Sequence, residues 1–127
     1  MENSILDLII RIKNGYMAKK EVIVSPHSKF KEQLLSKLKD LKFIKGYEVE
    51  GTLKKNITIK LSLDNETTFT DIEIFSKPGQ RHYVSYRELK PIVSGYGFSI
   101  LSTPLGILTD KEAKTKKVGG ELLFNIW

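Results

Sequence analysis

Cysteine is absent from this chain of 127 residues, and only two histidines and one tryptophan occur in it. Without cysteine the chain has no disulfide, no thiolate metal site and no cysteine nucleophile. His27 and His82 lack the companion spacing of a metal site, and no serine lies in the elbow motif of a hydrolase. The sequence therefore predicts a protein that is not an enzyme and that takes no cofactor, metal or small-molecule substrate.

Long hydrophobic runs are also absent, since none approaches the roughly 18 residues that cross a membrane. The starting segment, MENSILDLIIRI, has no basic region before its apolar stretch, so it differs from a secretory signal and from an arginine-rich transit peptide. From these absences we expect a soluble protein with no membrane partner, made in the compartment where it works.

Positive charge is in excess, with 21 Lys and Arg against 15 Asp and Glu and a pI of about 9.4. The excess lies in residues 1–63, which hold 13 basic and 7 acidic residues, whereas residues 64–127 hold 8 of each. This balance favours an anionic partner such as nucleic acid, although a merely soluble basic protein also explains it. Lys29 and Lys31 are candidates for phosphate contacts because they begin a predicted helix.

The first half of the chain shows two helical patterns. Apolar residues from Ile5 to Ile12 recur at helical spacing, with Asn3 or Ser4 as the N-cap and Gly15 after the end. Ser28 caps a second helix. Its apolar face comprises Phe30, Leu34, Leu35, Leu38 and Leu41, and the opposite face carries Lys31, Lys37, Lys39 and Asp40. Short strands are expected at residues 21–24, 47–49 and 57–63.

The polar segment 64–68 predicts a linker between an N-terminal half, residues 1–63, and a C-terminal half, residues 69–127. The second half shows a hairpin around the Ser76–Gly79 turn, a strand on either side of a loop at residues 102–106, and a terminal strand. Thr109 and Glu112 form a capping box for a short helix. The predicted fold class is α+β, with two helices on a small sheet followed by a β-rich half.

The glycine-rich run from Gly95 to Glu121 contains the best candidate for a binding loop. Ser102 and Thr103 lie between two apolar strands, and small hydroxyl residues in this setting suit sugar, backbone and base-edge contacts. A simple tight turn is the alternative. In the Ser76–Tyr83 turn, Lys77 and Arg81 are candidates for phosphate contacts. Tyr83 suits base stacking or, equally, an ordinary cross-strand contact.

Four collinear segments now carry a resemblance: DLIIRIKNG at 7–15, SPHSKFKEQLLSKLKDLKFI at 25–44, SKPGQRHY at 76–83 and GYGFSILSTPLGILTDKEAKTKKVGGE at 95–121. The chain resembles the bacterial-type ribosomal protein eight family of the small subunit. The resemblance implies that the two halves pack together and bind the central domain of small-subunit ribosomal RNA, helping to assemble the platform beside other ribosomal proteins. It also leaves open repression of its own messenger RNA.

The resemblance further implies a set of RNA-binding residues. The family's Ser-Thr-Ser loop falls on Ser102, Thr103 and Pro104, and the Lys-Gly that follows it falls on Leu105 and Gly106. This chain departs from the family at two of these positions, because Pro104 has neither hydroxyl nor N–H and Leu105 has no charge. The expected RNA-binding set is Ser102, Thr103, Pro104, Gly106, Lys29, Lys31, Lys77, Arg81, Tyr83, Gly120 and Glu121.

Gly119, Gly120 and Glu121 match the family's Gly-Gly-Glu segment, which lies beside the serine loop. Glu121 is expected to orient Ser102 or nearby backbone rather than to face RNA, because phosphates repel a carboxylate.

The class of function and the source of the chain both stay open. A free regulator that binds messenger RNA is the main alternative, and behind it stands a protein–protein adaptor that uses the last strand. Eighteen lysines against three arginines suggest an AT-rich genome, and the missing presequence suggests a bacterial or organelle-encoded gene. The residues SKPGQRHYVSYREL and the altered loop favour a mitochondrial ribosome over a bacterial or plastid one.

Overall fold

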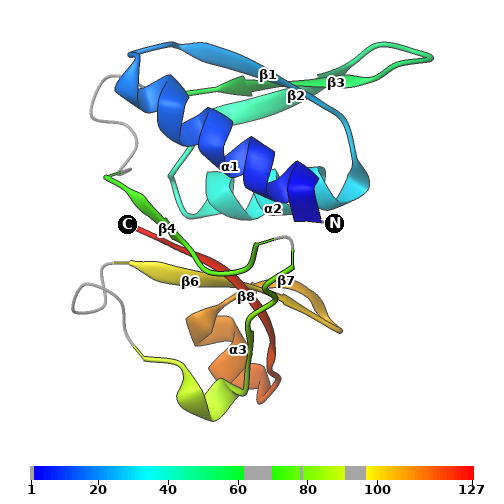
Figure 1. Cartoon of the computed structure of the whole chain (residues 1–127). Helices are drawn as coiled ribbons and strands as arrows, with labels where there is room; N and C mark the ends of the chain where they lie inside the picture. Colours follow the sequence, from blue (N-terminus) through cyan, green and yellow to red (C-terminus); the bar gives the residue numbers. More distant parts are fainter. Residues whose placement is uncertain (1, 62–69, 78, 91–96) are drawn as a thin grey trace. The chain divides into compact units, whose positions relative to one another are not determined.

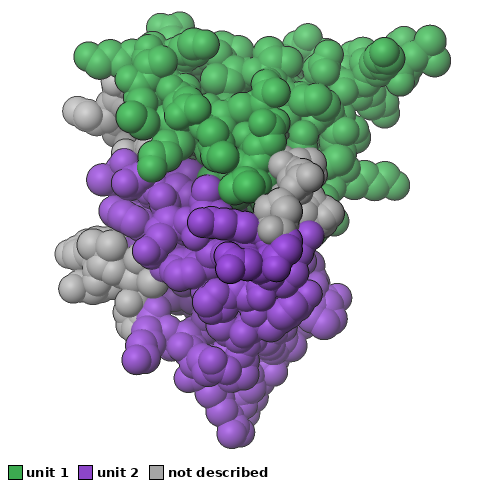
Figure 2. All heavy atoms as spheres, viewed as in Figure 1, with its two compact units in different colours: residues 1, 3–69 green, residues 2, 70–127 purple. Residues whose placement is uncertain are grey.

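The computed structural model describes residues 2–61, 70–77, 79–90 and 97–127, and the chain divides into two compact units (Figures 1 and 2). Unit 1 comprises residues 1 and 3–69, and unit 2 comprises residues 2 and 70–127. The predicted linker at 64–68 lies outside the described residues. None of the helices described is both long and apolar enough to span a membrane.

Unit 1 is a small antiparallel sheet with two helices on one face (Figure 1). The strand order is β1-β3-β2, so β1 is an edge strand. The helices and the central strand bury most of the apolar residues that the helical spacing and the alternation predicted, whereas Phe30 and Leu41 of the predicted α2 face are only partly buried. The elements are α1 (Glu2–Met17), β1 (Val22–Pro26), α2 (Lys29–Asp40), β2 (Gly46–Glu50) and β3 (Asn56–Lys60).

The ends of the two helices were predicted with different success. Ser28 caps α2 as expected, and its hydroxyl accepts from the Lys31 N–H at 3.1 Å. The limits of α1 were wrong, because α1 begins at Glu2 and continues through Gly15. A Cβ atom on Gly15 would lie 2.7 Å from Cδ1 of Leu61, so this glycine permits close packing of the helix instead of ending it.

The described part of unit 2 is a five-stranded antiparallel sheet with one short α-helix, which confirms the α+β class. The strand order is β4-β8-β6-β7, and β5 also pairs with β8. The Thr109–Glu112 capping box is confirmed at the start of α3. A core cluster contains Leu89, Leu101, Ala113 and Leu122. The elements are β4 (Ile72–Ile74), β5 (Tyr83–Val84), a 3-10 turn η1 (Tyr86–Glu88), β6 (Phe98–Thr103), β7 (Gly106–Thr109), α3 (Asp110–Lys116) and β8 (Gly120–Ile126).

The expected hairpin between the segments before and after the Ser76–Gly79 turn does not form as predicted. β4 and β5 each pair with β8, with Ile74 opposite Phe124 and Tyr83 opposite Glu121. Between β4 and β5 the only bridge among the described residues joins Lys77 to Gln80. The physical reason is the length of β8. It has seven residues, so its backbone N–H and C=O groups can pair with β5 near one end and with β4 near the other.

Candidate RNA-binding site

The predicted loop at 102–106 is a tight hairpin turn between β6 and β7. Thr103 pairs with Gly106, so Pro104 and Leu105 form the two-residue connection. Gly106 has a φ of +111°, a backbone conformation that favours glycine. The Thr103 hydroxyl donates to the Gly106 carbonyl at 2.8 Å and accepts from the Leu105 N–H at 3.1 Å. In this structure the hydroxyl proton of Thr103 therefore stabilises the turn and does not point toward another molecule.

The tip of this turn is apolar and exposed. Leu105 is 58% exposed, and Pro104 beside it is also exposed. Proline fixes φ near −65°, which stiffens the two-residue connection. The tip thus presents a rigid hydrophobic surface where the resemblance implied a hydroxyl and a cation.

The Gly-Gly-Glu segment lies directly against the Ser-Thr loop, as the resemblance implied. Ser102 pairs with Glu121 between β6 and β8. A Cβ atom on Gly120 would overlap the Ser102 carbonyl oxygen and lie 3.1 Å from Cα of Thr103. One on Gly119 would lie 2.5 Å from the Val84 carbonyl oxygen. The two glycines therefore let three backbone segments approach closely.

A row of side chains crosses the sheet at this point. Tyr83, Glu121 and Ser102 are directly opposite one another on β5, β8 and β6. Residues opposite one another in an antiparallel register share a face of the sheet. Tyr83 is 70% exposed and Ser102 is half-buried, whereas Glu121 between them is only 8% exposed. The row therefore offers an aromatic ring and a hydroxyl to a partner.

The side chain of Glu121 contacts a cation. Its carboxylate lies 3.5 Å from the Arg81 guanidinium, which extends from the segment before β5. No side-chain hydrogen bond joins Glu121 to Ser102, although their backbones are paired between β8 and β6 in the part of the chain that the structure describes. The expected role of Glu121 in orienting Ser102 or nearby backbone stays a prediction, and its carboxylate also contacts Arg81. A nearly buried carboxylate stabilises an adjacent guanidinium and fixes its position.

Lys77 lies on the exposed turn that precedes Arg81. The Lys77 N–H donates to the Gln80 carbonyl at 3.0 Å, and the Gln80 N–H donates back at 2.9 Å. Gly79 has a φ of +82° within this turn. No role was predicted for Ser76, whose hydroxyl donates to the Leu122 carbonyl and accepts from the His82 N–H at the base of the turn. A serine directly before a Lys-Pro-Gly sequence is the signal that could have found it.

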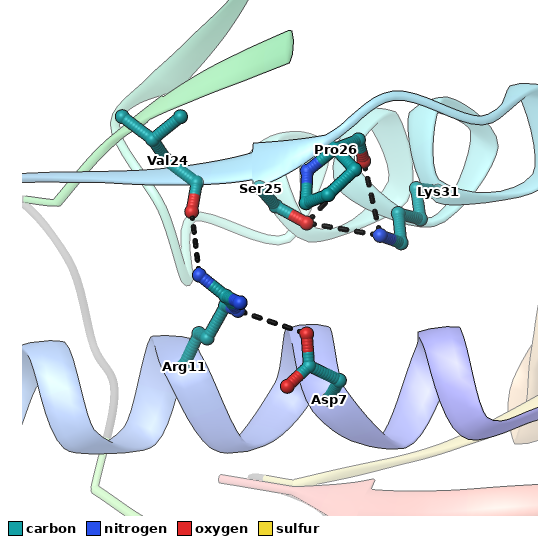
Figure 3. Close-up of polar contacts among 6 residues, drawn as sticks. All are labelled: Asp7, Arg11, Val24, Ser25, Pro26 and Lys31. Carbon is teal, nitrogen blue, oxygen red and sulfur yellow. Dashed lines mark hydrogen bonds and ion pairs between the residues drawn. The ribbon is translucent and has the colours of Figure 1, made fainter.

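Lys31 is placed differently from the prediction. Only 4% of it is exposed, and its ammonium donates to the Ser25 hydroxyl and to the Pro26 carbonyl, both at 3.0 Å (Figure 3). Burial lowers the pKa of Lys31, an effect that the charge of Asp7 opposes. The expected solvated position and phosphate contact are therefore wrong, because this ammonium satisfies acceptors of the edge strand β1. Lys29 is exposed, at the first position of α2.

Arg11 makes a similar contact with the same strand. Its guanidinium donates to the Val24 carbonyl at 3.1 Å and to the Asp7 carboxylate at 2.8 Å (Figure 3). Arg11 of α1 and Lys31 of α2 thus donate hydrogen bonds to two backbone carbonyl groups of β1. Both contacts belong to the architecture of unit 1.

The structure gathers one group of predicted residues within unit 2 through strand pairing and direct contacts. The turn 103–106 continues β6, and the residues around Glu121 connect it to the Lys77–Tyr83 segment. Lys29 and Lys31 belong to unit 1. The group in unit 2 comprises Ser102, Thr103, Pro104, Gly106, Lys77, Arg81, Tyr83, Gly120 and Glu121.

Comparison with known proteins gives consistent matches over almost the whole chain. A family model described as ribosomal protein S8 matches residues 3–127. A small ribosomal subunit protein uS8 from Mycoplasmopsis synoviae is 38% identical over 130 aligned residues, covering 100% of this chain and 98% of the relative. Its counterpart from Lactobacillus delbrueckii subsp. bulgaricus is 40% identical, with 100% and 98% covered. The counterpart from Dictyoglomus thermophilum is 41% identical, with 97% and 95% covered.

These three relatives come from bacteria. They give no support to the expectation of a mitochondrial ribosome over a bacterial one.

Proposed function

The chain belongs to the ribosomal protein S8 family, and we infer that it is a structural component of the small ribosomal subunit, without enzymatic activity. It is an RNA-binding member of a ribonucleoprotein that carries out translation. As a component of the small subunit it associates with ribosomal RNA and with other ribosomal proteins.

We propose that unit 2 binds a helical region in the central domain of small-subunit ribosomal RNA and so helps to assemble the platform. The observation that carries this proposal is the approach of Gly120 to the Ser102–Thr103 backbone, which aligns Tyr83, Glu121 and Ser102 across the sheet. Helical RNA displays sugars and base edges in a shallow minor groove, where a small hydroxyl such as that of Ser102 fits.

The other residues of the group supply different contacts. Tyr83, being 70% exposed, offers a ring on which an unpaired base stacks. Lys77 and Arg81 lie on the adjacent exposed turn and attract phosphates. Glu121 is only 8% exposed and lies 3.5 Å from Arg81, so the carboxylate stays largely away from the RNA. Exposed Lys29 in unit 1 adds a phosphate contact at the start of α2.

Tyr83→Ala should weaken binding to a central-domain RNA transcript by about 5- to 100-fold, the range that loss of one stacked base gives. Filter binding at fixed salt concentration measures this change. Tyr83→Phe retains the ring and serves as the matched control, with an affinity close to that of the wild type. Equal affinity of the alanine variant and the wild type would remove Tyr83 from the interface.

Leu105→Lys should strengthen binding to the same transcript and make it more salt-dependent, because the turn would regain a cation at its tip. One added phosphate contact makes the slope of log affinity against log salt more negative by about one. Met17→Lys adds the same charge at a residue of α1 that is 72% exposed, and so controls for net charge. If both variants gained affinity equally, the tip would not contact RNA.

Binding of the chain's own messenger RNA is a finer proposal that uses the same surface. It requires a messenger segment that imitates the ribosomal RNA site. Competition between the two RNAs for one protein tests this proposal. Cosedimentation through a high-salt sucrose gradient separates the ribosomal component, which stays with the small subunit, from a free regulator, which washes off.

A further inference from the structure

Ser76 occupies an unusual place in the hydrogen-bond ladder of unit 2. Its hydroxyl donates to the Leu122 carbonyl at 2.8 Å and accepts from the His82 N–H at 3.0 Å. On the same pair of residues, the Leu122 N–H donates directly to the His82 carbonyl at 2.7 Å. An antiparallel pair of this kind normally exchanges two backbone hydrogen bonds. The Ser76 hydroxyl is therefore inserted into the ladder in place of the second bond.

This insertion lies between β4 and β5, where the chain turns away from its partner strand β8 and then pairs with it again. On the departing side, the N–H groups of Phe75 and Ser76 donate to the Leu123 carbonyl at 3.0 and 3.3 Å. On the returning side, the His82 ring meets the Phe75 ring edge-on, with centroids 5.6 Å apart. Ser76 thus joins both ends of the segment 77–81 to a single strand.

The segment closed in this way carries two cations of the candidate site. Reciprocal backbone bonds join Lys77 and Gln80, and the Arg81 guanidinium lies 3.5 Å from Glu121. The direction of both cations depends on where the base of the segment is held. A side chain with one donor and one acceptor is required at position 76, because the Leu122 carbonyl and the His82 N–H need opposite partners.

We propose that Ser76 is a positioning residue for RNA binding, whose hydroxyl fixes the base of segment 77–81 and thereby directs Lys77 and Arg81 toward phosphates. This inference rests on the proposed binding of RNA by unit 2. Ser76 itself does not contact the RNA.

The test compares full-length wild type, Ser76→Ala and Ser76→Thr in binding to the central-domain transcript over a series of salt concentrations. Ser76→Ala should lower affinity by about tenfold, the effect of losing a bridging hydroxyl, with a salt slope reduced by about one as a phosphate contact is lost. Ser76→Thr keeps the hydroxyl and should restore both values.

Thermal unfolding of each variant distinguishes positioning from simple destabilisation. Ile59→Val, a buried change in unit 1, supplies a destabilised control, and its salt slope should equal that of the wild type. Failure of the wild type to bind the transcript would overturn the proposed function itself. If the wild type binds, unchanged affinity and slope in Ser76→Ala, or equal losses in the alanine and threonine variants, would overturn the role of the hydroxyl.

Discussion

Gly120→Ala should cost about 3 kcal/mol or more of the free energy of unfolding and should also abolish high-affinity RNA binding. The added Cβ atom would overlap the Ser102 carbonyl oxygen and lie 3.0 Å from its carbonyl carbon. Both neighbours are backbone atoms of the adjacent strand, so no side-chain rotation relieves the overlap. β6 and β8 would have to separate at the point where the candidate site is built.

Chemical denaturation of the full chain measures this loss, and filter binding measures the affinity. Gly46→Ala is the matched control, because a Cβ atom at Gly46 meets nothing within 4 Å. Its stability should stay within about 0.5 kcal/mol of the wild type. A Gly120→Ala protein as stable as the Gly46→Ala protein would show that the close approach of the two strands is not needed.

Lys31→Ala should destabilise the protein by about 1–3 kcal/mol, because it removes a buried donor from the Ser25 hydroxyl and the Pro26 carbonyl. Denaturant unfolding at neutral pH measures this change. Lys29→Ala removes an exposed lysine two positions earlier and should have little effect on stability. Equal stability of the two variants would contradict a structural role for Lys31.

The pH dependence of stability gives a second measurement for Lys31. Burial lowers the pKa of Lys31 in the folded state below the ordinary value of 10.5. Between these two pKa values the unfolded chain binds the proton and the folded chain releases it, so the free energy of unfolding rises with pH. The stability of the wild type relative to Lys31→Met should therefore increase as the pH approaches 10.5. A decrease would mean that the fold favours the charged ammonium.

Local patterns were sufficient for much of the fold. The caps at Ser28 and Thr109 were predicted because capping depends on residues within one helical turn. The half-buried strand around Ile57 and Ile59 was predicted because strand side chains alternate between faces. The prediction that Gly15 ends the helix was wrong. A side chain at this position would collide with Leu61, which lies far along the chain, so no local pattern shows why a glycine is needed.

The candidate site shows the same division. The family, the α+β class and the loop at 102–106 could be predicted from the residues alone, since these depend on collinear motifs and on spacing within short segments. The burial of Lys31, the contact of Glu121 with Arg81 and the bond from Ser76 to Leu122, 46 positions away, became visible in the folded chain. Burial and strand register depend on which distant backbone groups need a partner, and no local pattern records that need.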